Sequence, residues 1–275
     1  MSALASVPGA VLLVGAGKMG GALLESWLAR GLPAALVSVL DPTPAPEVAK
    51  LLATKRIARD PQPQLIPNHA AVVLAVKPQV ASSIMPHVAR FVGRDTVVVS
   101  IMAGKTLAFL SKHLPKNTAI VRAMPNTPAA IGRGITVAVP NVRVKADARD
   151  LADALLAATG PVEWIKNEKW MDAVTAVSGS GPAYVFLLAE SLARAGVAAG
   201  LPKPLAMKLA RETVSGAGEL LRRSDLDAAK LRENVTSPAG TTAAALKILM
   251  ARGGLDPLMK KAVAAATKRS RQLAS

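Results

Sequence analysis

A glycine-rich segment near the start of the chain sets the strongest limit on its fold. The apolar run Ala10–Val14, which contains β-branched residues, predicts a buried strand, and Gly15-Ala16-Gly17-Lys18-Met19-Gly20 follows at once. A helical pattern then continues until Gly31 and Pro33. A strand, a G-x-G-x-x-G turn and a helix in this order are typical of a dinucleotide-binding sheet.

Each glycine of this turn has a separate physical use. Gly15 permits a tight turn, Gly17 lets the backbone approach a pyrophosphate, and Gly20 lets the helix pack against the strand. A chance glycine turn is the alternative, because the motif by itself is weak evidence. In this context we predict that the cofactor is bound by Gly15, Ala16, Gly17, Lys18, Met19 and Gly20.

Asp41 follows the next predicted strand, Ala35–Leu40. An acid at this place accepts hydrogen bonds from the ribose hydroxyls of NAD and repels the 2′-phosphate of NADP. A turn aspartate before Pro42 is an equally good interpretation. We include Asp41 among the predicted cofactor-binding residues, and the choice between NADPH and NADH stays open.

Further apolar runs alternate with helical patterns over the first 165 residues. Predicted strands are Ala70–Val76, Thr96–Ile101, Ala119–Ala123, Ile135–Val139 and Val162–Ile165, and predicted helices are Pro46–Arg56 and Asp147–Ala158. This alternation predicts an α/β, Rossmann-type doubly wound sheet in a dinucleotide-binding domain, residues 1–165. Ligands of such sheets lie beyond the carboxyl ends of the strands. The further cofactor-binding residues predicted there are Val76, Lys77, Pro78, Ala103, Gly104 and Asn126.

After residue 165 helical patterns alone remain. They cover Lys169–Val177, Ala183–Ala199, Pro204–Leu221, Thr241–Ala251 and Leu255–Leu273. Residues 166–275 are therefore predicted to form an all-α dimerisation domain. The pattern of Ala183–Ala199 is apolar nearly all round, and a domain of roughly 110 residues can hardly cover all its faces alone. We expect a homodimer.

Two hydroxyl-rich segments precede predicted helices. The first is Ser178-Gly179-Ser180-Gly181, followed by Pro182, which suits the first position of a helix. We predict a loop there that faces the helix N-terminus, whose dipole attracts an anion. The second is Asn234–Thr242, which is built in the same way. The alternatives are a tight turn without a ligand in the first segment and a well-capped helix in the second.

Composition limits the partners. The chain has 34 Lys and Arg against 18 Asp and Glu, but the bases are dispersed and no aromatic residues alternate with them. We therefore expect an anionic small molecule as ligand and no nucleic acid. The chain has no cysteine, which excludes a thiolate metal site, and we predict no metal. No apolar run approaches the roughly 18 residues needed to cross a bilayer, so we expect a cytoplasmic protein without membrane contact.

Five segments together indicate a family. The chain contains, in this order, G-A-G-K-M-G, A-V-K-P-Q, M-P-N-T-P-A, V-S-G-S-G-P-A-Y and T-S-P-A-G-T-T. From Val11 to nearly the C-terminus it resembles pyrroline-5-carboxylate reductase, and the last two segments are the most specific. The resemblance implies reduction of Δ1-pyrroline-5-carboxylate to L-proline by NADPH or NADH, the final step of proline biosynthesis. It also implies dimers that often assemble into decamers, and it makes residues 166–275 the substrate domain as well as the dimerisation domain.

The resemblance further assigns residues to the site. It implies that Thr242 bonds the ring nitrogen of the substrate as the catalytic residue and that Asn234 contacts the cofactor. The substrate-binding residues that it implies, some of them reaching the site from the partner subunit, are Glu168, Ser178, Gly179, Ser180, Gly181, Ser237, Gly240, Thr241 and Thr242. Two positions depart from the family. Ala239 replaces a commoner glycine, and Asp41-Pro42 stands where relatives usually place Ser or Asn and then Arg, which puts NADP preference in doubt.

The implied chemistry needs few groups. A cyclic imine can arrive protonated and its iminium carbon then accepts hydride, so the protein mainly positions the ring and binds its carboxylate. The alternatives are a β-hydroxyacid dehydrogenase-like enzyme, another imine reductase, and a non-catalytic nucleotide-sensing or basic nucleic-acid-binding protein. A β-hydroxyacid dehydrogenase needs a lysine near a G-x-x-G-x-G loop in the helical domain, and we find none placed so.

Overall fold

The structure, a computed structural model, describes residues 3–63 and 69–274 of the 275-residue chain. It divides into two compact units. Unit 1 comprises Met1–Gly179 and Thr267–Ser275, and unit 2 comprises Ser180–Ala266. Residues 166–179 thus pack with the first unit, whereas the division of the chain into functional domains after residue 165 stays a prediction.

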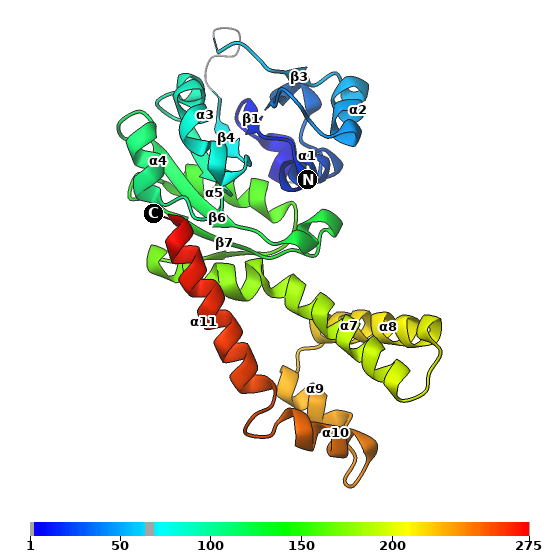
Figure 1. Ribbon diagram of the computed structural model, residues 1–275. Helices are drawn as coiled ribbons and strands as arrows, with labels where there is room; N and C mark the ends of the chain where they lie inside the picture. Colours follow the sequence, from blue (N-terminus) through cyan, green and yellow to red (C-terminus); the bar gives the residue numbers. More distant parts are fainter. Residues whose placement is uncertain (1–2, 64–68, 275) are drawn as a thin grey trace. The chain divides into compact units, whose positions relative to one another are not determined.

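Unit 1 is built on one eight-stranded sheet in the order β3-β2-β1-β4-β5-β6-β7-β8 (Figure 1). Neighbouring strands are parallel except for β6 and β7, which are antiparallel. The strands are β1 (Val11–Val14), β2 (Val37–Leu40), β3 (Ala58–Arg59), β4 (Ala71–Leu74), β5 (Val97–Ser100), β6 (Ala119–Met124), β7 (Thr136–Pro140) and β8 (Val162–Trp164). The chain adds strands on one side of β1 and then crosses to β4 on the other, which confirms the predicted doubly wound sheet.

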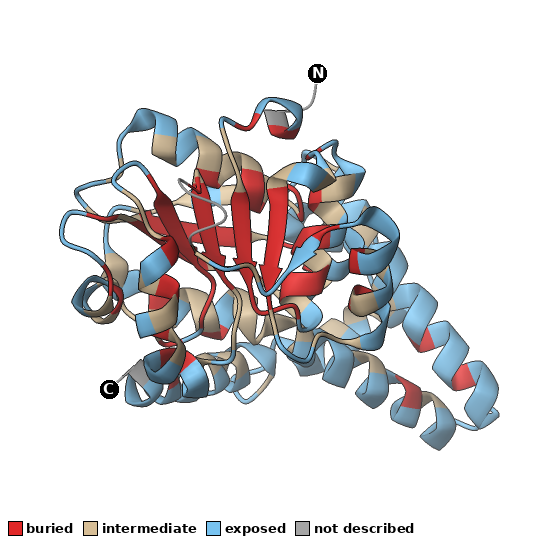
Figure 2. Ribbon diagram, turned by 90° about the horizontal axis from the view of Figure 1, so that it is seen from above, coloured by how far each residue is buried: buried red, intermediate tan, exposed pale blue. Residues whose placement is uncertain are grey.

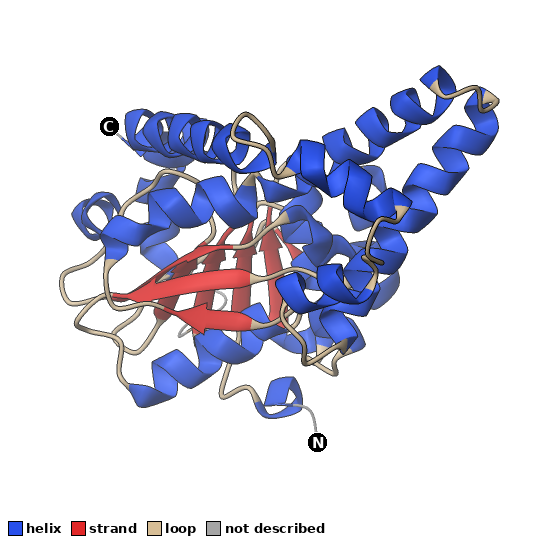
Figure 3. Cartoon of the chain, turned by 90° about the horizontal axis from the view of Figure 1, so that it is seen from below, coloured by secondary structure: helices blue, strands red, loops and turns tan. Residues whose placement is uncertain are grey.

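The central strands are buried because helices cover both faces of the sheet (Figures 2 and 3). Side chains alternate along a strand, so Val11 and Leu13 enter one apolar core while Leu12 and Val14 enter the other. The first core packs on α1 (Lys18–Ala29), α2 (Pro46–Lys55) and α5 (Ala146–Ala157), and the second on α3 (Ala81–Val88) and α4 (Leu107–His113). A strand that is apolar on both faces appears in the sequence as a continuous apolar run, so these strands could be predicted from the sequence.

Helices α4 and α9 (Ala228–Asn234) and the short edge strand β3 were not predicted. Both helices begin at a capping side chain that the sequence displays. Thr106 Oγ1 accepts a hydrogen bond from the N–H of Phe109 over 3.1 Å, and Asp227 Oδ1 accepts one from the N–H of Lys230 over 2.8 Å. These caps were the available signals. Short 3-10 segments complete unit 1 at η1 (Ala3–Ser6), η2 (Ala34–Leu36), η3 (Pro78–Val80), η4 (Ala89–Phe91), η5 (Thr127–Ile131) and η6 (Glu168–Trp170).

The predicted loop at Ser178-Gly179-Ser180-Gly181 is wrong. Helical backbone continues through α6 (Met171–Val174) and a π-helical turn, η7 (Thr175–Gly179), and Ser180 is itself in the right-handed helical region. The hydroxyls support this path, because Ser178 Oγ donates to the carbonyl of Val174 over 3.0 Å. Helix α7 (Gly181–Ala198) then begins with Pro182 in its first turn, as predicted.

Helices are the only regular elements among the described residues of unit 2, as predicted. Besides α7 and α9 it contains α8 (Lys203–Arg223), α10 (Thr241–Leu249) and α11 (Leu255–Ala274), whose last residues belong to unit 1. Helices α7 and α8 lie side by side (Figure 1) and bury Ala193, Ala206 and Ala210. Much of their apolar surface stays exposed, including Phe186 at 63% and Leu187 at 56%. Among the described helices, none is long and apolar enough to cross a membrane.

Candidate active site

The turn between β1 and α1 has the shape of a pyrophosphate cradle. Gly15 has a φ of +90°, a conformation that favours glycine, and a Cβ atom on it would lie 2.8 Å from Cγ1 of Val76. A Cβ atom on Gly20 would lie 2.1 Å from the carbonyl oxygen of Gly15, so the turn and α1 touch backbone to backbone. These two glycines are needed for the fold of the turn itself.

Gly17 differs from its neighbours. It is exposed, and a Cβ atom on it would meet no atom of the protein within 4 Å. It is also the N-cap of α1, it supplies no side-chain cap, and the first helical amide bond runs from Gly21 N to Gly17 O over 2.7 Å. The preceding N–H groups of α1 are those a helix leaves free for an anion. The cradle therefore fits the pyrophosphate of a nicotinamide dinucleotide.

Asp41 lies beside this cradle, directly after β2. Its Oδ2 accepts a hydrogen bond from the N–H of Ala16 over 2.7 Å, and its Oδ1 accepts one from the N–H of Thr43 over 2.9 Å. The first contact joins the end of β2 to the glycine turn, where the adenosine ribose of a dinucleotide lies. The second is a local Asx turn, which agrees with the interpretation of Asp41 as a turn aspartate, while its contact with a ribose stays a prediction.

The remaining predicted cofactor residues follow neighbouring parallel strands. Val76, Lys77 and Pro78 come after β4, Ala103 and Gly104 after β5, and Asn126 after β6. The parallel register places all of them at the same edge of the sheet as Gly15. Asn126 Oδ1 also accepts a hydrogen bond from the N–H of Ile135 over 2.9 Å, which ties the loop after β6 to the start of β7. Their contacts with a cofactor stay predictions.

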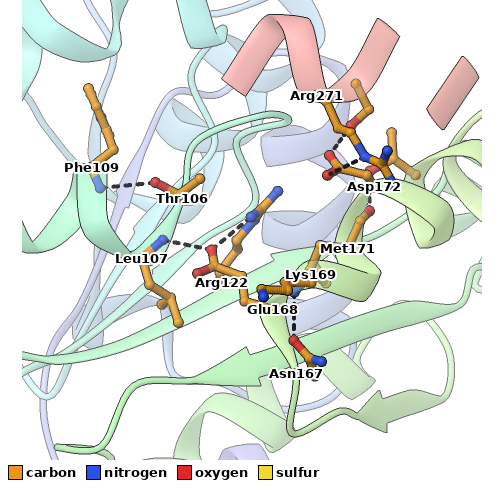
Figure 4. A network of polar contacts seen from close by, with 12 residues as sticks. Thr106, Leu107, Phe109, Arg122, Asn167, Glu168, Lys169, Met171, Asp172 and Arg271 are labelled. Carbon is orange, nitrogen blue, oxygen red and sulfur yellow. Dashed lines mark hydrogen bonds and ion pairs between the residues drawn. The ribbon is translucent and has the colours of Figure 1, made fainter. Parts of the chain in front are cut away.

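Glu168, predicted from the family resemblance to lie near the substrate, is held by two donors (Figure 4). Its Oε1 lies 2.7 Å from Nη1 of Arg122 and 2.8 Å from the N–H of Leu107. Oε2 accepts no hydrogen bond from the described part of the chain. The Arg122 side chain is only 6% exposed. Sequence reasoning missed Arg122, although a single cation inside an apolar strand was a usable signal.

The segment that carries Glu168 is also tied down at Asp172. Oδ1 of Asp172 accepts a hydrogen bond from Oγ of Ser270 over 2.7 Å, and Nε of Arg271 lies 3.8 Å from Oδ2 (Figure 4).

Further along, a Cβ atom on Gly179 would lie 2.6 Å from Cε of Met124, the last residue of β6. The π-helical turn with Ser178 and Gly179 is thus packed against the carboxyl end of a central strand. A π-helical turn is frequently found at functional sites.

The other predicted substrate residues and Asn234, which was predicted to contact the cofactor, belong to unit 2. Asn234 ends α9, Ser237 lies in the loop that follows, and Gly240 is the N-cap of α10, while Ser180 and Gly181 stand at the start of α7. Gly240 supplies no side-chain cap, and the first helical bond runs from Ala244 N to Gly240 O over 3.1 Å. The amides of the first turn, at Thr241, Thr242 and Ala243, are therefore those left free for an anion.

Thr242 is half-buried at this helix start. Its hydroxyl makes no hydrogen bond within the described residues, whereas Thr236 Oγ1 in the same loop donates to the carbonyl of Arg232 over 2.6 Å. The interpretation of Thr242 as a capping residue is not supported, because the N-cap is Gly240. Ala239 has a φ of +57°, in the region where glycine is favoured, and this explains the commoner glycine of the family motif.

Comparisons with known proteins agree with these observations. A family described as pyrroline-5-carboxylate reductase dimerisation matches residues 168–273, and one described as NADP oxidoreductase coenzyme F420-dependent matches residues 10–104. The pyrroline-5-carboxylate reductases of Pseudomonas aeruginosa and Mycobacterium leprae are 38% and 40% identical, each over 96% of both chains.

Solved structures extend this similarity to the fold. A pyrroline-5-carboxylate reductase from Coxiella burnetii superposes with a TM-score of 0.90 at 32% identity, covering 97% of this chain and 99% of the other. The pyrroline carboxylate reductase of Plasmodium falciparum, solved with NADP bound, has a TM-score of 0.81 at 28% identity, covering 98% and 99%. From its glycine turn to its last helix, the chain belongs to the pyrroline-5-carboxylate reductase family.

Proposed function

We propose that the protein reduces Δ1-pyrroline-5-carboxylate to L-proline with NADPH or NADH, the final step of proline biosynthesis. The observation that carries the proposal is the open turn at Gly17, which fits a dinucleotide pyrophosphate in a chain of this family. Gly15 to Gly20 hold the pyrophosphate on the N-terminus of α1, and Asp41 faces the adenosine ribose. The bound cofactor supplies the hydride.

The substrate is a small anion, and α10 offers it a matching site. The amides of Thr241, Thr242 and Ala243 and the hydroxyl of Ser237 bind the carboxylate of the ring. The Thr242 hydroxyl accepts the N–H of the protonated ring and so orients the electrophilic carbon. Because the iminium form already carries its proton, the reaction needs no acid to protonate the substrate at the moment of hydride transfer.

The proposal also assigns Glu168 to the substrate. Its Oε1 is occupied by Arg122 and Leu107, so only Oε2 is available as a negative charge for the positively charged ring. Ser178 and Gly179 lie in the π-helical turn beside the end of β6. Ser180 and Gly181 follow at the start of α7, where small side chains let a ligand approach the backbone.

The chain carries the dimerisation domain of its family, and the exposed apolar faces of α7 and α8 match a subunit interface. We propose that dimers assemble further into a decamer and that the loop before α10 completes the site of the partner subunit. Sedimentation at micromolar concentration tests the assembly. A stable monomer with full activity would contradict the shared site.

The activity is tested with one spectrophotometric assay. Proline with NAD or NADP at alkaline pH should produce the absorbance of reduced nicotinamide, and Δ1-pyrroline-5-carboxylate should consume it near neutral pH. A β-hydroxyacid is the matched control substrate for the alternative enzyme class. Turnover of the β-hydroxyacid without turnover of proline would overturn the proposal.

A further inference from the structure

A second acid, Asp60, is hydrogen-bonded to the backbone of Asp41. Asp60, which follows β3, accepts a hydrogen bond from the N–H of Asp41 on its Oδ1 over 2.9 Å. Its Oδ2 lies 3.2 Å from Nε of Arg59, and the same Nε lies 3.2 Å from the carbonyl oxygen of Asp41. The Arg59 guanidinium also donates to the carbonyl of Pro42. The end of β2 is therefore surrounded by two carboxylates and one guanidinium.

We propose that the Arg59–Asp60 pair determines the choice between NADH and NADPH, and that Asp60 directs it to NADH. This inference rests on the proposed dinucleotide site and adds two residues to it. The adenosine ribose lies at the end of the second strand in a Rossmann-type sheet, so a 2′-phosphate would stand beside this cluster. It would bring up to about two negative charges to a place where carboxylates outnumber the guanidinium.

Arg59 is the one cation in these contacts, and the edge of its guanidinium formed by Nε and Nη2 is already engaged. Arginine binds phosphate best with two parallel N–H groups, but Nε of Arg59 is shared between a carboxylate and a carbonyl, and Nη2 is on Pro42. The Arg59 side chain is 47% exposed, so it can turn toward a phosphate once the opposing charge of Asp60 is removed. Asp60 thus both repels the 2′-phosphate and withholds its ligand.

The geometry of Asp60 makes a clean variant available. Its φ is +45°, a conformation that asparagine tolerates better than most residues. Asp60→Asn removes the charge and retains an oxygen for the N–H of Asp41. Asp60→Gly also suits the positive φ and serves as a second variant, because it removes the charge together with the whole side chain.

Calorimetric titration with adenosine 2′,5′-bisphosphate and with 5′-AMP tests the proposal on the full-length protein. We expect Asp60→Asn to strengthen binding of the bisphosphate about fivefold, the upper range for an exposed charge pair, and to leave 5′-AMP binding within about twofold. The double variant Arg59→Gln with Asp60→Asn should lose the gain. Lys55→Gln removes an exposed cation outside the cluster, four positions before Arg59 in the chain, and is the control.

If Asp60→Asn left the ratio of the two dissociation constants unchanged, because both affinities or neither changed, the proposal would be overturned. A gain that persists in the double variant would also overturn it, because Arg59 would then not be the phosphate ligand. Neither probe carries a nicotinamide and no turnover is measured, so a protein without reductase activity can still satisfy this test. Absence of 5′-AMP binding in the unmodified protein would remove the dinucleotide site itself, and with it both proposals.

Discussion

Oε1 of Glu168 lies 2.7 Å from Nη1 of Arg122, and this ion pair joins η6 to the buried centre of the sheet across 46 positions in the chain. The same oxygen accepts the N–H of Leu107 at the start of α4. One carboxylate therefore fixes three elements whose ends lie near the proposed cofactor edge. Its structural role can be separated from any role in substrate binding.

Replacing Glu168 by Gln should leave Arg122 as a buried and uncompensated charge. Loss of one partner of a buried pair costs about 3–5 kcal/mol, and we expect about 2–3 kcal/mol here because the Glu168 side chain is 29% exposed. The urea midpoint of unfolding measures this. Glu163→Gln, on the exposed face of β8, is the control and should leave the midpoint unchanged. Equal midpoints for wild type and Glu168→Gln would exclude the structural role.

Gly17 and Gly20 should respond differently to an added methyl group. Gly17→Ala has open space around its Cβ, so we expect an unchanged melting temperature and weaker nucleotide binding, and Gly17→Val should abolish that binding. Gly20→Ala should lower stability as well, because its Cβ would meet the carbonyl of Gly15 at 2.1 Å. Calorimetry and thermal melts on the three variants check this. Unimpaired nucleotide affinity in Gly17→Val would disprove the cradle.

Thr242→Ala should reduce kcat/KM about ten- to a hundredfold. A hydrogen bond to a charged group contributes about 1.5–3 kcal/mol, and each factor of ten corresponds to about 1.36 kcal/mol. Thr242→Ser keeps the hydroxyl and should keep most of the activity. Since Thr242 is not the N-cap of α10, neither variant should melt much below wild type. If alanine instead lowered stability by about 1 kcal/mol with intact kinetics, Thr242 would be a structural residue of the helix start.

Ala239→Gly should stabilise the loop before α10. A residue with a side chain at φ +57° costs about 1–2 kcal/mol, and glycine loses about 0.5–1 kcal/mol more backbone entropy on folding, so a net gain of about 0.5–1 kcal/mol remains. A small rise in the urea midpoint would show it. Pro238→Gly, one residue earlier, has no such conformation to relieve and should not raise stability. A midpoint that falls in Ala239→Gly would contradict the assigned strain.

Local patterns in the sequence determined most of the strands, the glycine cradle and most of the helices. The apolar runs of β1, β4 and β5 and the roles of Gly15 and Gly20 could be predicted, because strand burial and glycine turns depend on residues close together in the chain. The motif with Pro182 likewise indicated where α7 begins, and the ordered motifs identified the family.

Contacts between distant residues were decided only by the tertiary structure. The path of Ser178 and Gly179 follows a π-helical turn packed on Met124, which no local turn signal reveals. Arg122 meets Glu168 across 46 positions, and Ser270 meets Asp172 across 98. Such pairs form because sheet register and helix packing bring particular atoms within hydrogen-bond distance, and a one-dimensional pattern carries neither the register nor the distance.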